Sequence, residues 1–377
     1  MRPALKFHTA WAYTKGTLMA YRLIDLFAGA GGMTLGFTNR RFGGGFRSVW
    51  AVDLDEAAVQ TYRKNFGEHA DCADIEDWLA SGKPVPAADV VVGGPPCQGF
   101  SLLNKQRVGD RRRELWQPFM DVVGLSGAQA FVIENVAELL SSPEADAIKA
   151  RARELGFDTV SSVLMAADYG APQTRRRAVI VGWKRDLGGE PVFPPLPTHA
   201  SPASRSNLPR WRTVWDAISD LPAPLGTSIR NDPPPLDLHF GRNPTLKSLE
   251  RYRAVPPGGN RFDLQRNAPE ITPKCWINKT SGGTDLFGRL WWERPSVTIR
   301  TEFFKPEKGR YLHPEEDRPI THREAARLMG FPDDFKFVGT KVEIARQIGN
   351  AVPPPLGGAI AGVVGDLLSR RSVRKAA

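Results

Sequence analysis

The chain has 377 residues and a mass of 41.6 kDa, and 41% of its residues are hydrophobic, which is enough for a sizeable core and about two domains. Its three cysteines, Cys72, Cys97 and Cys275, show no Cys-x-x-Cys or Cys/His spacing, which excludes a disulfide framework and a structural zinc site. No apolar stretch approaches the roughly 20 residues of a membrane span. The sequence therefore predicts a soluble, cytoplasmic protein without a metal or a membrane contact.

The charge is strongly basic, with 51 Lys and Arg against 41 Asp and Glu and a net charge of +10. Residues 191–300 hold 15 of the basic and 9 of the acidic residues, so a surplus of 6 lies in less than a third of the chain. Such an excess favours a polyanionic partner through phosphate contacts. Charge alone does not distinguish this from a basic protein that binds no particular polyanion.

Strand-like and helix-like patterns alternate after residues 1–18, which are expected to be a disordered extension and receive no function. The alternation predicts an α/β fold with a parallel, doubly wound sheet over residues 19–190. The predicted strands are 21–27, 46–52, 89–92, 130–133, 161–165 and 178–181, and the clearest helices are 32–39 and 56–66.

The pattern changes after residue 190. Residues 191–260 contain 14 of the 32 prolines, which predicts a second, smaller and irregular domain without long helices, assigned to residues 191–290. Helical periodicity returns in residues 321–329 and 342–368, within a C-terminal segment assigned to 291–377.

A glycine-rich loop follows the first predicted strand and opens a helix, as Gly29-Ala-Gly31-Gly32. Glycines at this place let a ligand approach backbone N–H groups. The residue three positions after Gly31 is Thr34, so the dinucleotide fingerprint G-x-G-x-x-G is absent. Asp53, at the end of the second strand, can accept both hydroxyls of a ribose. The loop predicts a nucleoside ligand without a pyrophosphate, and the alternative is a glycine turn that serves only close packing.

Cys97 lies in Gly93-Gly-Pro-Pro-Cys97-Gln-Gly-Phe-Ser101, directly after the strand 89–92. The carboxyl ends of strands in open α/β sheets form ligand-binding crevices, and two prolines restrict the backbone before the thiol. Nearby basic side chains favour the thiolate. We therefore expect Cys97 to be reactive, whereas Cys72 and Cys275 are expected to be inert.

Two further polar groups lie at strand ends. Glu134, in Glu134-Asn135-Val136, comes to the same sheet edge as Cys97 and is either a solvated strand terminus or an acid–base group. Arg175 and Arg177 alternate along a strand and are predicted to share a face, where two guanidiniums suit a carbonyl oxygen or a phosphate. The alternative is a solvated basic strand end.

Together and in this order, these motifs resemble those of the cytosine-C5 DNA methyltransferases of bacterial type. The resemblance extends to Arg294-Pro-Ser-Val-Thr-Ile299 and Gln347-Ile-Gly-Asn350-Ala-Val-Pro353, and it covers roughly residues 20–190 and 290–365. Two departures are small. Asp53 stands where the family more often has Glu, and Ala351 where Ser is common.

The resemblance implies methyl transfer from S-adenosylmethionine to C5 of a cytosine, with S-adenosylhomocysteine as product and no metal. Cys97 would add to C6 of the ring, Glu134 would protonate or hydrogen-bond N3, and Arg177 with Arg175 would bind O2. Because C6 is hidden in stacked DNA, the target base would be flipped out of the duplex. The implied cofactor contacts are Phe27, Ala28, Gly29, Gly31, Gly32, Asp53, Leu54, Asp74, Ile75, Pro95, Asn350 and Ala351.

The family further implies that residues 191–290 recognise the target sequence, and that the helix after Asn350 returns to pack beside the first strand. Segment 98–116 resembles the family's mobile loop over flipped DNA. The predicted partner is double-stranded DNA, bound by a monomer that acts in restriction–modification or phage defence with a cognate endonuclease or defence complex. The expected DNA contacts are Gln98, Ser101, Lys105, Arg107, Arg111, Lys274, Asn278, Lys279 and Arg289.

Three alternatives are weaker. A transfer-RNA cytosine methyltransferase would carry a Cys-Phe-Thr signature, whereas Trp276 follows Cys275. A catalytically silent DNA-binding module would be expected to have lost its cysteine, glutamate or arginines. A folate-dependent pyrimidine methylase also uses a Pro-Cys nucleophile, but the glycine loop and Asp53 favour a nucleoside cofactor.

Overall fold

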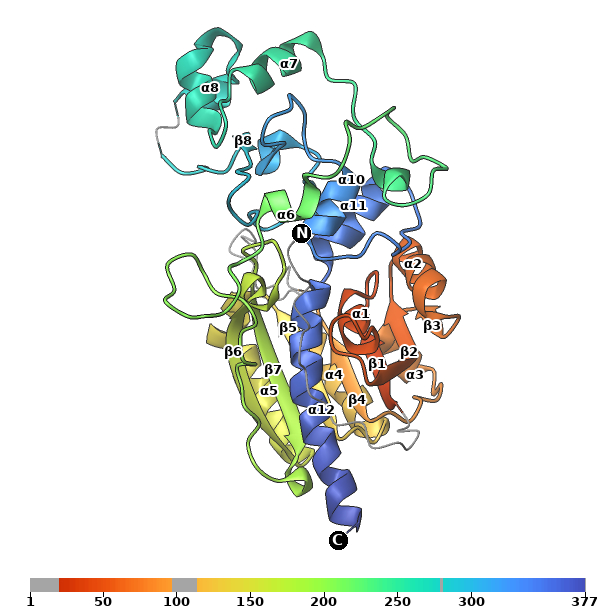
Figure 1. The fold of residues 1–377 in the computed structure, drawn as a ribbon. Coiled ribbons are helices and arrows are strands. Elements are labelled where there is room, and N and C mark those ends of the chain that lie inside the picture. Colours follow the sequence, from red (N-terminus) through yellow and green to blue (C-terminus); the bar gives the residue numbers. More distant parts are fainter. Residues whose placement is uncertain (1–19, 97–113, 279–280, 377) are drawn as a thin grey trace, which may run out of the picture.

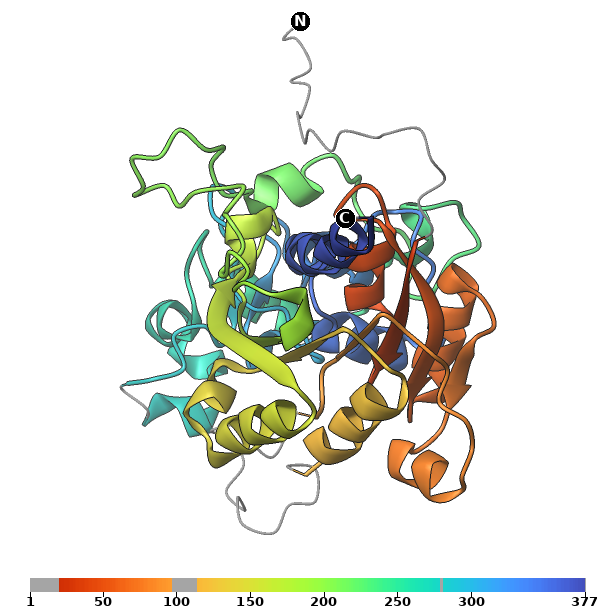
Figure 2. The same ribbon diagram turned by 90° about the horizontal axis from the view of Figure 1, so that it is seen from below.

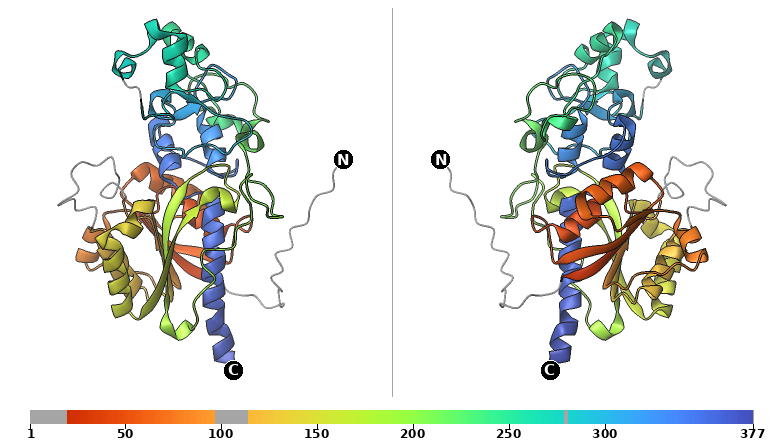
Figure 3. Two further views of the ribbon diagram at one scale, coloured as in Figure 1. Left: turned by 90° about the vertical axis from the view of Figure 1, so that its left-hand side faces the viewer. Right: turned by 90° about the vertical axis from the view of Figure 1, so that its right-hand side faces the viewer.

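The structure is a computed structural model that describes residues 20–96, 114–278 and 281–376, with side chains described up to residue 370. A lower α/β part holds the main sheet, and an upper part of short helices and loops stands over it (Figure 1). The side views show the upper part above the sheet edge where the glycine loop lies (Figure 3).

The main sheet has seven strands in the order β3-β2-β1-β4-β5-β7-β6. Its strands are β1 (Tyr21–Leu26), β2 (Phe46–Asp53), β3 (Ala70–Cys72), β4 (Val90–Gly93), β5 (Ala130–Asn135), β6 (Phe157–Met165) and β7 (Arg176–Lys184). The helices between them are α1 (Gly32–Thr38), α2 (Glu56–Phe66), α3 (Ile75–Ala80), α4 (Trp116–Leu125) and α5 (Pro143–Glu154). The predicted doubly wound α/β fold is confirmed.

One strand departs from the expected parallel arrangement. β7 pairs antiparallel with both β5 and β6, whereas β1 pairs parallel with β2 and β4. The cause is the short connection between β6 and β7. β6 and β7 are joined by a 3-10 turn at Ala166–Tyr169 and a short loop, and a parallel neighbour would need a crossover of a dozen or more residues.

The sheet separates two hydrophobic cores. On β4, Val90 and Val92 face the core beneath α1 and the C-terminal helix, whereas Val91 faces the core beneath α4 and α5. These strands are buried on both sides, which explains their continuous run of valines. Figure 2 shows α4 and α5 on one side of the sheet, and α1 with the C-terminal helix on the other.

The last segment forms α10 (His322–Leu328), α11 (Lys341–Asn350) and α12 (Pro354–Ala376). The single helix expected over 342–368 is thus two helices, because the chain is extended at Ala351 and breaks before Pro354. α12 runs back through the lower part and packs beside α1, whereas the resemblance implied a place beside the first strand. A Cβ atom placed on Gly36 of α1 would lie 2.6 Å from the backbone of Gly357, so glycine permits this close contact.

The helices in the described residues of 191–290 are short, as the prolines predict. They are α6 (Val214–Ile218), α7 (Leu246–Arg253), α8 (Arg261–Asn267) and α9 (Lys274–Ile277), with a two-stranded sheet of β8 (Gly288–Arg289) and β9 (Arg310–Leu312). In both parts together, further 3-10 turns occupy Ala137–Ser141, Arg185–Leu187, Leu236–Leu238, Pro269–Ile271 and Pro306–Lys308.

Within the described ranges, no single helix is long and apolar enough to cross a membrane. α11 and α12 pass that test only when they are taken together, as a pair bent by 41°.

Candidate active site

The glycine loop after β1 has an unusual backbone. Phe27, Gly29 and Gly31 have φ values of 55°, 54° and 84°, so three alternate residues are left-handed. Such a conformation is strained for phenylalanine and is typical of ligand-binding turns. A Cβ atom on Gly29 would meet nothing within 4 Å, so the space beside this glycine is open.

Asp53 closes one side of the loop from the end of β2. Its carboxylate accepts the backbone N–H of Gly29 at 2.8 Å and of Asp55 at 2.9 Å. Burial raises the pKa of Asp53, and these hydrogen bonds oppose that rise. Leu54, the next residue, is 68% exposed.

Four more of the predicted cofactor contacts lie at two helix ends. Asp74 is the N-cap of α3 and accepts the N–H of Glu76 at 2.7 Å, and Ile75 is buried. Asn350 is the exposed last residue of α11, and the buried Ala351 packs against the glycine loop at Gly32. Gly32 and Ala351, 319 positions apart in the sequence, therefore meet at this loop.

A carboxylate and a guanidinium meet at the ends of β5 and β7. Glu134 Oε1 and Arg177 Nε are 2.8 Å apart, with side-chain exposures of 10% and 15%. A Cβ atom on Gly94 would lie 3.1 Å from Glu134 Oε2. The pair thus adjoins the segment Gly94-Pro95-Pro96, which leads to Cys97.

Asn135 holds this segment in place. Its side-chain amide is buried and donates to the carbonyl of Pro95 at 2.9 Å, while its oxygen accepts the N–H of Val136 at 2.8 Å. The residue next to Glu134 therefore fixes the backbone two positions before Cys97. Sequence reasoning included Asn135 in a motif but gave it no role.

Arg175 does not join Arg177. Its guanidinium is buried and donates to the carbonyls of Ile299 and Gly349, both at 3.0 Å. Arg175 lies directly before β7 and contacts these two distant carbonyls, whereas Arg177 lies within the strand and pairs with Glu134. Arg176 is exposed, as expected.

Arg289 is wrongly predicted as a DNA contact. The side chain is 3% exposed, and its N–H groups donate to the carbonyls of Tyr252, Val255, His313 and Glu316 and to the carboxylate of Asp317. A guanidinium has five N–H donors, so these contacts leave Arg289 nothing with which to read a base edge.

The remaining predicted residues fall into two groups. Lys274 and Asn278 are exposed on and directly after α9. Seven others lie outside the described residues, namely Cys97, Gln98, Ser101, Lys105, Arg107, Arg111 and Lys279.

Sequence reasoning missed a buried network beneath the glycine loop. Asp25 Oδ2 accepts the hydroxyl of Thr34 at 2.6 Å, the Tyr62 hydroxyl lies 3.0 Å from that of Thr34, and Ser48 lies 2.7 Å from Tyr62. Burial raises the pKa of Asp25 to about 7, and the Thr34 hydrogen bond opposes the rise. The sequence signal for this network was the carboxyl residue Asp25 inside an otherwise hydrophobic predicted strand.

Comparisons with known proteins agree with this site. Residues 21–366 match the family model described as C-5 cytosine-specific DNA methylase. The chain is 36% identical to Type II methyltransferase M1.HphI of Haemophilus parahaemolyticus, over 92% of this chain and 87% of the relative. It is 33% identical to Type II methyltransferase M.NgoFVII of Neisseria gonorrhoeae, over 88% of this chain and 83% of that relative.

A solved structure is also similar. It is a putative DNA modification methyltransferase encoded within an E. coli prophage, with a TM-score of 0.67 and 26% identity over 93% of this chain and 99% of that one. The transfer-RNA and silent-module alternatives are not favoured by these relatives. The chain therefore belongs to the C-5 cytosine-specific DNA methylases, a family of S-adenosylmethionine-dependent DNA (cytosine-5-)-methyltransferases.

Proposed function

We propose that the chain methylates a cytosine flipped out of a specific duplex site through a transient bond between Cys97 and C6. The observation that carries the proposal is the Glu134–Arg177 pair beside Gly94-Pro95-Pro96. It supplies an acid–base group and a cation at the point where the backbone leads to the thiol.

The proposed roles divide the chemistry among three side chains, Cys97, Glu134 and Arg177. The Cys97 thiolate adds to C6, and Glu134 donates a proton or a hydrogen bond to N3, so that the electron pair develops at C5. Arg177 stabilises the charge at O2 and orients Glu134. Methyl transfer to C5 with S-adenosylhomocysteine as the leaving group, release of the C5 proton to a base, expulsion of the Cys97 thiolate and return of any N3 proton to Glu134 complete the reaction. Arg175 is assigned a structural role in place of the O2 contact.

S-adenosylmethionine supplies an electrophilic methyl group bound to a sulfonium. The open space at Gly29 and the adjacent Asp53 carboxylate fit its nucleoside part. We assign its binding to Phe27, Ala28, Gly29, Gly31, Gly32, Asp53, Leu54, Asp74, Ile75, Pro95, Asn350 and Ala351.

DNA recognition is assigned to residues 191–290, with Lys274, Asn278 and Lys279 as base or phosphate contacts. The further DNA contacts are assigned to Gln98, Ser101, Lys105, Arg107 and Arg111. The relatives named as Type II methyltransferases support a restriction–modification role with a cognate endonuclease. Because the substrate is DNA and these relatives are bacterial, we propose a monomer that acts on the chromosome in the bacterial cytoplasm.

The test is Cys97→Ala, with Cys72→Ala and Cys275→Ala as matched controls because both of those thiols are exposed. Methyl incorporation into unmethylated, amplified DNA should fall by at least about a thousandfold in Cys97→Ala, because a covalent step is removed. The controls should keep their activity, and DNA retention on a filter should persist in all three. Turnover by Cys97→Ala would overturn the proposed nucleophile.

A further inference from the structure

Helix α11 carries a cation to which no role has been assigned. Arg346 lies four positions before Asn350, so both side chains project from the same face of the helix. The Arg346 guanidinium meets the carboxylate of Asp55, whose Oδ2 accepts the Nε–H at 2.9 Å and lies 2.7 Å from Nη2. The two residues are 291 positions apart in the sequence. This ion pair therefore joins α11 to the segment that follows β2.

Asp55 connects the guanidinium to the carboxylate assigned to the ribose. Its side chain is the N-cap of α2, where Oδ1 accepts the N–H of Ala57 at 3.1 Å and of Ala58 at 3.4 Å. Its backbone N–H donates to Asp53 Oδ1 at 2.9 Å. A shift of Asp55 would therefore move both the start of α2 and the hydrogen bond that orients Asp53.

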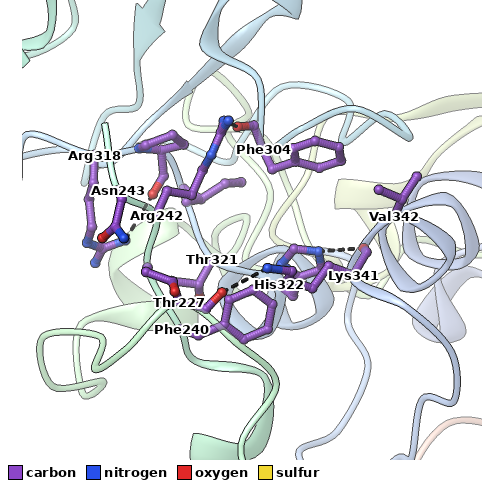
Figure 4. A pocket seen from close by; sticks show the side chains of 13 residues that line it. Thr227, Phe240, Arg242, Asn243, Phe304, Arg318, Thr321, His322, Lys341 and Val342 are labelled. Carbon is purple, nitrogen blue, oxygen red and sulfur yellow. Dashed lines mark hydrogen bonds between the residues drawn. The ribbon is translucent and has the colours of Figure 1, made fainter. Parts of the chain in front are cut away.

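The two ends of α11 are held by other contacts. At its start, His322 Nε2 lies 2.8 Å from the carbonyl of Lys341, and Lys341 Nζ donates to the carbonyl of Thr227 (Figure 4). Near its end, Arg175 donates to the carbonyl of Gly349 at 3.0 Å. These contacts attach α11 to the upper part and to the segment before β7. The contact of α11 with α2 comes from the middle of the helix.

Two side chains in the middle of α11 supply the contact with α2. Gln347 accepts the hydroxyl of Thr61 at 2.7 Å, and both of these groups are buried. Arg346 and Asp55 form the outer contact, with side-chain exposures of 48% and 23%. The buried hydrogen bond belongs to the packing of the two helices, whereas the outer ion pair adjoins the exposed Leu54.

The assigned cofactor contacts lie on both sides of this ion pair. Four of them lie where β2 leads into α2 or where α11 ends, namely Asp53, Leu54, Asn350 and Ala351. We propose that Arg346 is a positioning residue for the cofactor. Through Asp55 it holds the end of α11 against the end of β2, and it thereby sets the affinity for the nucleoside part of S-adenosylmethionine. This inference rests on the proposed cofactor site.

The experiment measures the affinity of the full chain for S-adenosylhomocysteine by calorimetry in the absence of DNA. Arg346→Ala removes the cation. Asp55→Asn removes the charge of its partner but keeps an N-cap, because asparagine caps helices as well as aspartate does. Arg41→Ala is the matched control, since it breaks another exposed pair between distant segments, with Asp334 at 3.4 Å. Circular dichroism confirms that each variant is folded.

A partly exposed ion pair changes an equilibrium constant by about fivefold or less. Arg346→Ala and Asp55→Asn should therefore each weaken S-adenosylhomocysteine binding by about two- to fivefold, and Arg41→Ala should bind as the wild type does. In turnover with DNA, the KM for S-adenosylmethionine should rise by the same factor while kcat changes little, because the proposed reacting groups are untouched. Arg346→Lys keeps the charge and should recover part of the affinity.

The double variant Arg346→Ala/Asp55→Asn shows whether the two residues act as a pair. Its affinity should match that of the weaker single variant, because the second change removes a contact that is already lost. An affinity that falls by the product of the two single effects would overturn the proposal, as would single variants that bind like Arg41→Ala.

Asp53→Ala separates this inference from the cofactor site on which it rests. Loss of the assigned ribose carboxylate should weaken S-adenosylhomocysteine binding by about tenfold or more. If Asp53→Ala binds less tightly and Arg346→Ala does not, the cofactor site stands and the role of Arg346 is overturned. If the wild type does not bind S-adenosylhomocysteine, or if Asp53→Ala binds it equally well, the proposed site fails and the inference fails with it.

Discussion

Arg175 and Arg177 lie two positions apart in the sequence and contact different partners. Arg177 pairs with Glu134 at the proposed cytosine pocket, whereas Arg175 binds carbonyls of residues 124 and 174 positions away in the sequence. One buried guanidinium thus ties the strand that carries Arg177 to the helix end that carries Asn350. Strand alternation describes only neighbours along the chain, so it could not reveal this long-range contact.

Asp25 carries a testable pH dependence. Its pKa rises from 3.8 to about 7 on burial, so as pH rises between these values the unfolded carboxyl ionises first and the wild type loses stability. The Asp25→Asn variant does not lose stability in this way, because an amide does not ionise. Relative to the wild type, its free energy of unfolding in urea should therefore rise by up to about 4 kcal/mol between about pH 4 and pH 7.

The control for this experiment is Asp366→Asn, at an exposed position on α12. The pH dependence of its stability difference from the wild type is the baseline for that of Asp25→Asn. A difference for Asp25→Asn that varies with pH no more than this baseline would contradict the raised pKa of Asp25.

Among the elements, α1 and α12 meet through small residues. Gly36 of α1 faces Gly357 and Gly358, and Gly43 lies against the carbonyl of Gly358. The contact holds the start of α12, and with it Ala351 and Val352, against the glycine loop. In the sequence, the cause of this contact is visible only as Gly36, the run Gly43–Gly45 and the pair Gly357-Gly358.

Gly36→Ala tests this contact. The added methyl group would lie 2.6 Å from the backbone of Gly357, so the helices must separate, at a cost of about 1–3 kcal/mol. Gly362→Ala is the matched control on α12, where a Cβ atom meets nothing within 4 Å and the change should stabilise the helix by about 0.5–1 kcal/mol. Equal effects in thermal unfolding would contradict the close contact.

Across the whole molecule, the upper and lower parts are joined by hydrogen bonds between distant segments. Gln173 accepts the N–H of Ile299 at 2.9 Å, and the N–H of Thr174 donates to the carbonyl of Ser296 at 2.8 Å. The strand that leads to Arg177 is therefore anchored to the chain that leaves the upper part.

Exchange of residues 191–290 for those of a bacterial relative should transfer the sequence preference of methylation, because the proposed catalytic residues lie outside this range. The donor must retain an arginine at the position of Arg289, since its loss would leave four buried carbonyls without a partner. Bisulfite sequencing of methylated DNA reads the outcome. An unchanged preference in an active hybrid would place recognition elsewhere.

Local sequence determined the α/β lower part, the proline-rich upper part and the motifs at the strand ends, because hydrophobic period, turn residues and short-range spacing act between neighbours in the chain. Tertiary structure alone decided the antiparallel β7, the burial of Arg175 and Arg289 and the raised pKa of Asp25. Each of these depends on the partners that folding brings together, carbonyls and carboxylates dozens of residues away, which no short pattern encodes.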